Sequence, residues 1–363
     1  MPGLFSEYSL KGHTIKNRIA MPPMVTPFYT GPDGVVTEKS VDHYNIRAAG
    51  GPGIVIVEAT AVQEFGRLAT YQLGLWHDKF IPGLESIATV IKKSGALALL
   101  QIHHAGLVTP ESVSPVCKGP SADMKNPRSQ ELTLKEIEII REDFISAALR
   151  AKKSGFDGIE LHGAHGYLLN QFASSMFNKR EDSYGSSMEG RLKLAMDILR
   201  GIRSDAGHQF IIGYRMGANS PLLEDGVEIA RHLEQSGVDI LHVSHGGSLQ
   251  NLPRPPKDFD YNWIVFSGTI VKKEVSIPVI VVNEIKTAVR ASYLLDNDMA
   301  DFVALGRPIL ADPAWTKHVQ NKQPVNVCSS CKPKCRWYES SGLCPAIMRL
   351  SKPSNDEPLK IES

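Results

Sequence analysis

The chain has 363 residues, of which 42% are hydrophobic, and its 40 basic residues are balanced by 39 acidic ones. A net charge of +1 is too small to favour a nucleic acid or an anionic membrane surface as the main partner. The N-terminus lacks the continuous apolar region of a signal peptide, and no run of about 18 apolar residues occurs. We therefore expect a cytoplasmic protein that binds a small, neutral or anionic molecule.

Eight apolar, strand-like runs alternate along the chain with longer segments of helical periodicity. The runs cover residues 18–24, 53–60, 96–104, 157–163, 210–217, 239–246, 278–283 and 301–306. Runs that are apolar throughout are typical of parallel strands covered on both faces, and eight such units close naturally into a barrel. An open Rossmann sheet is the competing architecture, but no GxGxxG follows an early strand. The predicted fold is an α/β (β/α)8 TIM barrel over residues 1–320, with a short cysteine-rich tail over residues 321–363.

The segment 134–153 shows most clearly how the helices are encoded. Its apolar residues recur at steps of three and four, and Thr133 with Glu136 forms a capping box at its start. Two segments break the alternation, 108–131 and 249–261, and both are rich in proline or glycine. Each follows a strand, so we expect both to cover the face where barrels hold their active sites.

Polar residues are concentrated where the strands end. In a barrel these ends meet at one mouth, and the fourth run ends in His162, His165 and Tyr167. Apolar walls with a few converging polar groups are typical of small-molecule pockets. We therefore expect these three side chains to be catalytic. The turns 244–247 and 306–307 offer glycine N–H groups and the Arg307 guanidinium, which favours a phosphorylated ligand.

Several segments in chain order resemble the old yellow enzyme family. They are KNRIAMPPM, VEATAV, QIHHAG, ELHGAHGYLLNQF with YGSSMEGR, GYRMGA and ALGRPILADPAW, and together they span nearly all of residues 1–320. The resemblance is greatest to the branch that includes the barrel domains of 2,4-dienoyl-CoA reductase and trimethylamine dehydrogenase, because a cysteine cluster follows the eighth run. It implies a barrel that binds FMN at its mouth, is reduced by NAD(P)H and reduces an activated alkene.

The resemblance also implies roles for individual residues. His162 and His165 would hold a substrate oxygen while the β-carbon accepts hydride from flavin N5, and the Tyr167 phenol, with a usual pKa near 10, would donate the proton. Arg215 would stabilise the negative charge of the reduced flavin. The residues implied to contact FMN are Pro23, Met24, Val25, Ala59, Gln101, Arg215, Asn283, Gly306 and Arg307. Gln101 would donate to the pyrimidine edge, and Gly306 with Arg307 would hold the phosphate.

Two positions depart from the family pattern. Val25 stands where a cysteine or threonine commonly tunes the flavin, so we assign no tuning residue. Asn283 stands in a turn that is often rich in glycine, which puts a close backbone approach to the phosphate in question.

The tail carries Cys328, Cys331, Cys335 and Cys344 within 17 positions. Four thiolates this close suit a metal centre better than a secretory disulfide framework. An iron–sulfur cluster of the 4Fe-4S type, a structural Zn site and free thiols all remain open, because spacing alone does not separate them. A cluster would pass electrons to a separate electron-transfer protein.

Three interpretations of function follow. The first is an FMN-dependent ene-reductase driven by NAD(P)H, acting on a substrate with a conjugated carbonyl. The second is a dehydrogenase or demethylase of an amine, with Tyr167, Tyr261 and Trp263 as a possible aromatic cage. The third is a barrel without flavin that binds a sugar phosphate. Homo-oligomers are common among such barrels, but no local signal in the sequence predicts one.

Overall fold

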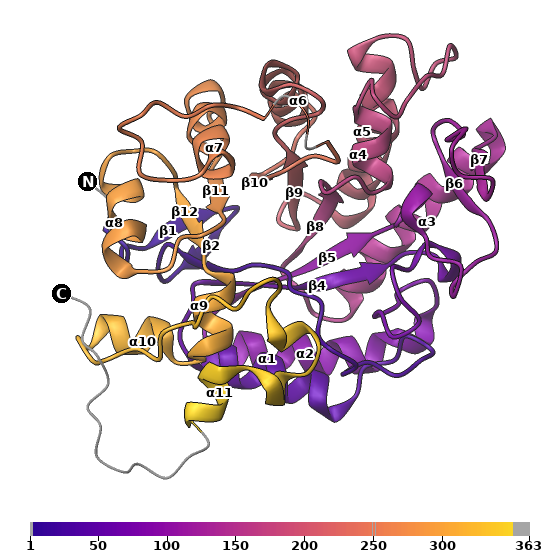
Figure 1. The fold of residues 1–363 in the computed structure, drawn as a ribbon. Coiled ribbons are helices and arrows are strands. Elements are labelled where there is room, and N and C mark those ends of the chain that lie inside the picture. The colour runs from indigo at the N-terminus through magenta and orange to yellow at the C-terminus, as the bar shows by residue number, and fades with distance from the viewer. Residues whose placement is uncertain (1–2, 249, 251, 351–363) are drawn as a thin grey trace.

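The computed structural model describes residues 3–248, 250 and 252–350, and its centre is a closed barrel of eight parallel strands (Figure 1). Around the barrel the strands follow the order β10-β11-β12-β3-β4-β5-β8-β9. Their bounds are β3 (Ile19–Met21), β4 (Ile54–Ala61), β5 (Leu97–His103), β8 (Gly158–Gly163), β9 (Ile211–Gly217), β10 (Ile240–Ser244), β11 (Val279–Val282) and β12 (Phe302–Ala304). Seven of the eight predicted runs contain one of these strands, and the eighth, 53–60, stops one residue before β4 ends, so the predicted TIM barrel is confirmed.

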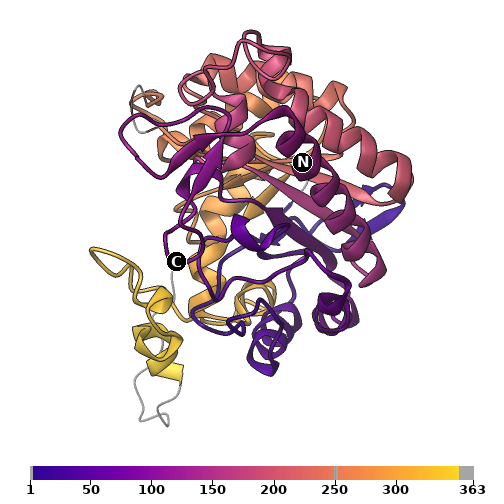
Figure 2. The ribbon, with the colours of Figure 1, turned by 90° about the vertical axis from the view of Figure 1, so that its right-hand side faces the viewer.

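Helices surround the barrel on its outside (Figures 1 and 2). The long ones are α1 (Glu38–Ala49), α2 (Ile81–Lys93), α3 (Leu134–Lys153), α5 (Met188–Ala206), α6 (Leu223–Gln235), α7 (Trp263–Glu274) and α8 (Ala288–Asp296). The short ones are α4 (Leu168–Ala173), α9 (Gly306–Ala311), α10 (Trp315–Gln320) and α11 (Pro345–Leu350). Helix α3 has the predicted bounds, and its capping box is present, since the Thr133 side chain accepts from the Glu136 N–H and the Glu136 carboxylate accepts from the Thr133 N–H.

The strands are buried on both faces, as their uninterrupted apolar sequences require. Inward-pointing residues such as Ile54, Leu99 and Phe302 fill the barrel, while the alternate residues pack against the helices. An N-terminal hairpin of β1 (Tyr8–Leu10) and β2 (His13–Ile15) adds side chains to the inner cluster. The hairpin leads into β3 and closes the end of the barrel where the strands begin. The open end therefore lies where the strands finish.

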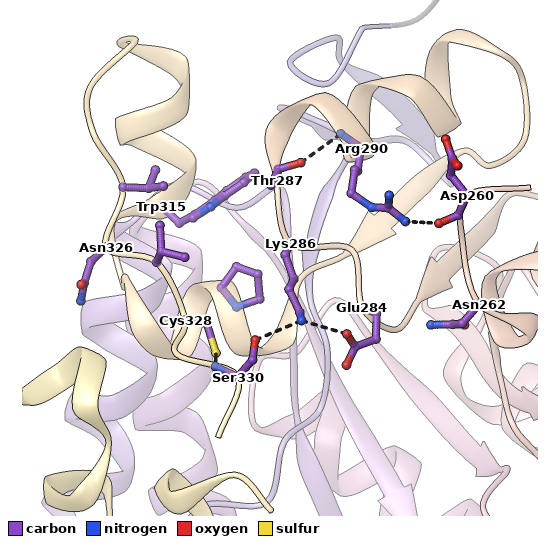
Figure 3. Close-up of a pocket in the computed structure, with 13 residues that line it drawn as sticks. Asp260, Asn262, Glu284, Lys286, Thr287, Arg290, Trp315, Asn326, Cys328 and Ser330 are labelled. Carbon is purple, nitrogen blue, oxygen red and sulfur yellow. Dashed lines mark hydrogen bonds and ion pairs between the residues drawn. The ribbon is translucent and has the colours of Figure 1, made fainter. Parts of the chain in front are cut away.

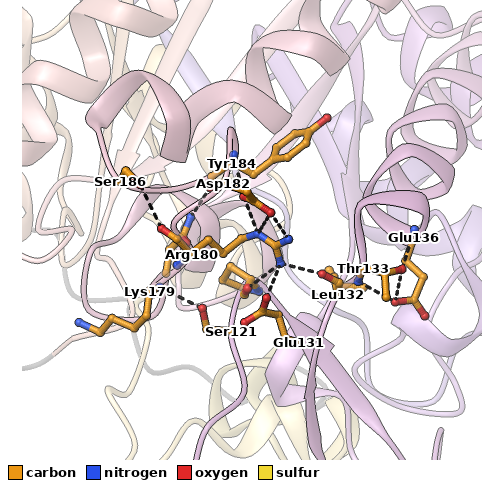
Figure 4. Close-up of polar contacts among 12 residues, drawn as sticks. Ser121, Glu131, Leu132, Thr133, Glu136, Lys179, Arg180, Asp182, Tyr184 and Ser186 are labelled. Atoms are coloured by element: carbon orange, nitrogen blue, oxygen red, sulfur yellow. Dashed lines mark hydrogen bonds and ion pairs between the residues drawn. The ribbon is translucent and has the colours of Figure 1, made fainter.

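The predicted insertion 108–131 contains a small parallel sheet of β6 (Cys117–Gly119) and β7 (Ser129–Glu131). The buried Arg180 fixes this sheet to the segment that follows α4 (Figure 4). Its Nη1 donates to the carbonyl oxygens of Pro120 (3.0 Å) and Leu132 (2.6 Å), while its Nε donates to the Asp182 carboxylate at 3.0 Å. The insertion is thus tied to the chain segment that carries Tyr167. In the second predicted insertion, residues 252–261 form neither helix nor strand.

The tail packs beside the barrel near α1 and contains the short 3₁₀ turns η4 (Arg336–Tyr338) and η5 (Ser341–Leu343) (Figure 1). Trp337 anchors it, because only 1% of this side chain is exposed and its ring contacts His43 of α1 at 5.6 Å between centroids. The division into a barrel and a tail domain at residue 320 stays a prediction, and residues 351–363 lie outside the described residues. Among the described helices, none has the length and apolar character needed to cross a membrane.

Candidate active site

A continuous chain of polar contacts crosses the mouth of the barrel from β5 to β10. His103 Nδ1 lies 3.0 Å from His162 Nδ1, and His162 Nε2 lies 3.0 Å from His165 Nδ1. His165 Nε2 then lies 2.8 Å from Ser244 Oγ. The predicted catalytic histidines are thus in direct contact, and residues at the ends of two other strands hold them in place.

His165 takes part in this chain because of an unusual backbone conformation. Its φ of 63° lies in the left-handed region, which few residues other than glycine adopt. Its backbone N–H donates to the carbonyl of His245 at 3.0 Å, which ties the turn after β8 to the turn after β10. Strain of this kind is frequent at functional sites.

Tyr167 lies against the same histidines. Its ring centroid is 4.6 Å from that of His103 and 4.8 Å from that of His162, both in edge contact. Within the described residues its hydroxyl makes no hydrogen bond, so it is available to a ligand. Burial raises the pKa of Tyr167 above its usual value of 10, while nearby Arg215 acts in the opposite direction. The phenol therefore carries its proton at neutral pH.

The histidines of the mouth are neutral in the folded protein. Burial is the main cause that lowers the pKa values of His103, His162, His165 and His242 below the usual 6.5, and for His162 and His165 neighbouring histidines and Arg215 add to the effect. A neutral imidazole can donate one hydrogen bond and accept another. The site can therefore bind an oxygen without holding a fixed positive charge on its histidines.

We expect this burial to make the fold sensitive to acid. Below pH of about 6.5 the unfolded chain binds more protons on these four histidines than the folded chain does, so the unfolding free energy falls by up to about 1.4 kcal/mol per histidine for each pH unit. Glu58 acts in the opposite direction, because burial raises its pKa to about 7, but it is a single group. Urea unfolding between pH 7 and 5 checks this expectation, and a flat profile contradicts it.

Arg215 of β9 is a buried cation that forms no ion pair with any residue the structure describes. Only 8% of it is exposed, its Nε has no partner, and its Nη2 lies 3.5 Å from Ser244 Oγ. The nearby Glu160 carboxylate instead accepts from Gln101 Nε2 at 2.7 Å and contacts His242 Nδ1 at 2.8 Å. An unpaired buried guanidinium is costly. Arg215 is thus ready to bind an anionic group.

A cavity of about 540 Å³ opens beside these residues, which is within the usual range for small-molecule sites. Its lining includes seven of the predicted site residues: Pro23, Met24, His165, Arg215, Asn283, Gly306 and Arg307. Gly306 borders the cavity. A Cβ atom at this position would crowd the Met24 sulfur at 3.1 Å, so the lack of a side chain avoids a close contact there. The cavity and the unpaired Arg215 together fit an anionic, phosphorylated ring cofactor such as FMN.

Other predicted site residues lie outside the lining of this cavity. His162 and Tyr167 adjoin it through His165, whereas Val25, Ala59 and Gln101 do not line it. One hydrogen of the Gln101 amide is engaged by Glu160, which leaves its second N–H for the predicted bond to the flavin. The flavin contacts of these three residues stay predictions.

The structure clarifies two glycine questions raised by the sequence. Asn283 has a φ of 101°, so it adopts the backbone conformation for which glycine is usual, and the turn keeps its shape. The turn 244–247, by contrast, uses its glycines for packing. The Gly246 N–H donates to Asn219 Oδ1 at 2.7 Å, and a Cβ on Gly247 would lie 2.7 Å from the Gly166 Cα. The Gly246 N–H is therefore engaged within the protein, and a phosphate role for this turn stays a prediction beside that of Gly306 with Arg307.

Sequence reasoning missed the contribution of the tail to this cavity. Lys334, Cys335 and Tyr338 line it together with the barrel residues, although more than 100 positions separate them from Arg215. Tyr338 lies near both guanidiniums of the cavity, because Arg215 and Arg307 both influence its pKa. The only signal in the sequence was the neighbouring cysteine motif.

A second cavity of about 520 Å³ lies between the loop after β11 and residues 325–330 (Figure 3). Lys286 joins the two walls, because its Nζ contacts Glu284 Oε2 at 2.9 Å and Ser330 Oγ at 3.0 Å. Cys328 lines this outer cavity, whereas Cys335 lines the inner one. Glu284, Lys286 and Pro308 line both cavities, so the two adjoin at the loop after β11, and the cysteine segment borders each of them.

The four tail cysteines lie within electrostatic reach of one another. Burial is the main cause that raises the pKa of Cys335, and Cys328, Cys331 and Cys344 raise it further. Among the described residues, however, no three His, Cys, Asp or Glu side chains converge on a point where they could hold one metal ion. Their role as metal ligands stays a prediction.

Comparison with known proteins places the chain in a family. The sequence profile of the "NADH:flavin oxidoreductase / NADH oxidase family" matches residues 3–326. An NADH oxidase from Thermoanaerobacter brockii is 39% identical over 349 residues, covering 92% of this chain and 53% of that protein. An NADPH dehydrogenase from Listeria welshimeri is 38% identical over 325 residues, covering 87% and 94% respectively. This chain thus spans about half of the first relative and nearly all of the second.

Solved structures agree with this placement. An old yellow enzyme homologue from Zymomonas mobilis has a TM-score of 0.79 at 25% identity and covers 94% of this chain and 99% of its own. A histamine dehydrogenase from Rhizobium sp. 4-9 has a TM-score of 0.78 at 26% identity and covers 90% of this chain and 49% of its own. The family match overturns the interpretation as a barrel without flavin. The chain belongs to the NADH:flavin oxidoreductase / NADH oxidase family, the family of old yellow enzyme, and is an FMN-dependent NAD(P)H oxidoreductase.

Proposed function

We propose that the chain uses electrons from NAD(P)H to reduce an activated, α,β-unsaturated alkene. The observation that carries this proposal is the grouping of two neutral imidazoles and a protonated phenol beside the flavin cavity. Bound FMN would accept hydride from NAD(P)H and deliver it to the alkene. The protein would supply the hydrogen bonds, the proton and the fixed charges.

His162 and His165 would bind the substrate oxygen. Their Nε2 and Nδ1 atoms are 3.0 Å apart, so one oxygen placed beside them can reach both. Hydrogen bonds to a carbonyl oxygen withdraw electrons from the conjugated double bond and favour hydride addition at its β-carbon. Tyr167 lies next to both rings and would deliver a proton to the α-carbon.

Arg215 and Arg307 would hold the cofactor at opposite ends. Arg215 is buried and unpaired, which suits it to stabilise the negative charge of a reduced ring. Arg307 is half-buried and follows Gly306 at the start of α9, where it forms an ion pair with Glu284. A phosphate at Gly306 would compete with Glu284 for this guanidinium.

An amine substrate is the second candidate, supported by the histamine dehydrogenase neighbour and by the tail cysteines. The proposed aromatic cage, however, does not assemble. The Tyr261 hydroxyl donates to the Arg290 carbonyl and the Arg290 guanidinium covers its ring at 4.2 Å, while Trp263 lines a separate surface cavity with Leu222 and Pro253. The site therefore favours an oxygen-bearing substrate.

Two measurements test this function. The purified protein should be yellow, with the absorption bands of oxidised flavin, and it should oxidise NADH or NADPH when cyclohexenone is added. Trimethylamine with an electron acceptor should give no turnover. If the protein binds flavin but turns over only the amine, the dehydrogenase function is supported and the ene-reductase function is refuted. A colourless protein that does not take up FMN would contradict both functions.

For the tail we propose a 4Fe-4S cluster held by the four cysteines, with electrons passing to a separate partner. A zinc ion requires four sulfurs each about 2.3 Å from one point, whereas a cluster spreads its ligands over several iron atoms. The influence of Cys328, Cys331 and Cys344 on the Cys335 pKa supports a shared centre for the four thiols. Anaerobic purification should yield iron and sulfide in equal amounts, and zinc without sulfide would contradict the cluster.

We also expect Tyr338 to help retain the flavin, because it lines the cavity from the tail. Tyr338 is 47% exposed in the structure, so a bound cofactor would cover part of its ring. Replacing Tyr338 with alanine should therefore speed FMN release about tenfold, since covering an aromatic ring contributes on the order of 1.5 kcal/mol. Tyr338→Phe keeps the wall and should change the rate little. Recovery of free-flavin fluorescence after dilution measures the rate, and equal rates in all three proteins would exclude this role.

A further inference from the structure

The side chain of Glu160 is buried inside the barrel, although a barrel that needed only stability would place an apolar residue there. Its neighbours on β8, Ile159 and Leu161, pack toward the helices, so Glu160 points inward, as His162 does two residues later. Only 2% of Glu160 is exposed. A buried carboxylate is costly unless its hydrogen bonds are satisfied, so the partners of Glu160 indicate what it does.

Glu160 joins two residues that come from other strands of the barrel. Its Oε1 accepts from Gln101 Nε2 at 2.7 Å, across the neighbouring strand β5. Its Oε2 lies 2.8 Å from Nδ1 of His242 on β10, although β9 lies between β8 and β10. The β9 residue opposite Glu160 is Gly213, which has no side chain. The carboxylate therefore reaches across β9 inside the barrel.

Both partners donate to Glu160. The amide nitrogen of Gln101 can only donate. Burial lowers the pKa of His242 below its usual 6.5, so its ring is neutral, and its Nε2 is buried without a hydrogen-bond partner among the described residues. Because an orphaned N–H is rarer in protein interiors than an acceptor without a donor, the ring proton lies on Nδ1 and faces Glu160. Both oxygens thus accept, as those of an ionised carboxylate do.

This carboxylate fixes which way the Gln101 amide faces. Since an ionised carboxylate only accepts, the nitrogen of the amide must lie on the side of Glu160. The amide then presents its second N–H and its carbonyl oxygen to other partners. A donor beside an acceptor matches the pyrimidine edge of a flavin, which has carbonyl oxygens next to an N–H group. Glu160 thus prevents Gln101 from turning over and losing this match.

Glu160 also acts on Arg215 through its charge. Arg215 lies two residues beyond Gly213 on β9, so the two charges belong to the same part of the barrel. Burial lowers the pKa of Arg215, and Glu160 is the largest influence in the opposite direction. Among the described residues the two form no direct ion pair. The guanidinium therefore keeps its N–H groups for a ligand while part of its charge is offset.

We propose that Glu160 is a positioning residue that tunes the flavin, by orienting Gln101 and by offsetting the charge of Arg215. The sequence assigns this role to no residue, because Val25 stands at the usual position. The offset limits how strongly the site favours the reduced, negatively charged ring over the neutral oxidised ring, so the reduced flavin remains a good hydride donor. The inference rests on the flavin contacts within the proposed function and is independent of the substrate.

Two variants of Glu160 separate its charge from its position. Glu160→Gln keeps the size of the side chain and removes the charge. Bound reduced FMN should then gain about tenfold in affinity relative to oxidised FMN, which raises the reduction potential by about 30 mV for this two-electron couple. Glu160→Asp keeps the charge but is too short to hold Gln101, so FMN should bind more weakly at a potential close to that of the parent protein.

Reduction of the bound flavin beside a reference dye measures the potential, and titration of the flavin-free protein with FMN measures the affinity. A merely structural role of Glu160 would weaken FMN binding in both variants and leave the potential unchanged. An unchanged potential in Glu160→Gln, or equal shifts in both variants, would overturn the proposal. A parent protein that takes up no FMN would overturn the proposed function as well.

A double variant covers the case in which Glu160→Gln alone does not fold. Glu160→Gln combined with Arg215→Met removes both buried charges, so neither is left without its counterpart. Because the charge of Glu160 acts on the flavin whether or not Arg215 is present, the double variant should have a potential about 30 mV above that of Arg215→Met alone. Equal potentials in these two proteins would refute the tuning role.

Discussion

Replacing Tyr167 with phenylalanine should leave the reduction of the flavin by NAD(P)H intact and slow alkene reduction about 10²–10⁴-fold. The ring contacts with His103 and His162 survive this change, so only the proton donor is lost. Stopped-flow measurement of the two half-reactions separates the effects. Tyr293→Phe, on the exposed side of α8, serves as the control, because this side chain lies far from the cavity lining.

Two outcomes would count against the proton-donor role of Tyr167. Unchanged alkene reduction in the phenylalanine variant would show that the proton comes from another group or from water. An equal loss in both half-reactions would show that the variant disturbs the flavin site rather than the proton transfer. Only the selective loss supports the assignment.

Replacing Arg215 with methionine should slow the reduction of the flavin without lowering the free energy of unfolding. Because the guanidinium is buried and forms no ion pair among the described residues, the free energy of unfolding of the flavin-free protein should stay the same or rise by about 1–3 kcal/mol. Reduction of the flavin by NAD(P)H should slow by about 10²–10³-fold, because the charge that stabilises the reduced ring is gone. Denaturant unfolding of the flavin-free protein and rapid-reaction kinetics of the loaded protein measure the two quantities.

Arg203 provides the matched control for this experiment. It donates to Asp239 Oδ2 at 2.6 Å and to the Phe210 carbonyl at 2.8 Å, so Arg203→Met should lower the free energy of unfolding by about 1–3 kcal/mol. Its distance from the mouth should leave flavin reduction unaffected. A destabilised Arg215→Met protein with normal flavin reduction would reverse our assignment and make Arg215 a structural residue.

The barrel was predictable because its strands are the easiest elements to detect. Eight apolar runs stand out from helical segments such as α3, whose bounds the capping box and the periodicity both define. The hairpin of β1 and β2 escaped notice, because strands of three residues with exposed faces carry no clear alternation. Strands β6 and β7 escaped for a similar reason, since they lie within a segment rich in proline and glycine.

Site residues at the ends of strands could be predicted from the sequence. Site residues that reach the cavity through packing between distant segments could not. The grouping of His162, His165 and Tyr167 follows from their place at the end of β8. The contribution of Tyr338 depends on how the tail folds back over the barrel, which no local pattern encodes. The packing role of Gly246 and Gly247 was also hidden, because glycines that allow two backbones to touch look the same in sequence as glycines that bind an anion.

The closure of the barrel has a consequence for how the protein is made. Strand β3, the first of the barrel, pairs with β12, the last, through Val303 opposite Ile19. During synthesis on the ribosome, the edge of β3 that pairs with β12 therefore stays unpaired until nearly the whole chain has been made. Uncovered edges recruit strands from other molecules, but short edges do so poorly. With three residues each, β3 and β12 form a seam that limits aggregation of the nascent chain until the barrel can close.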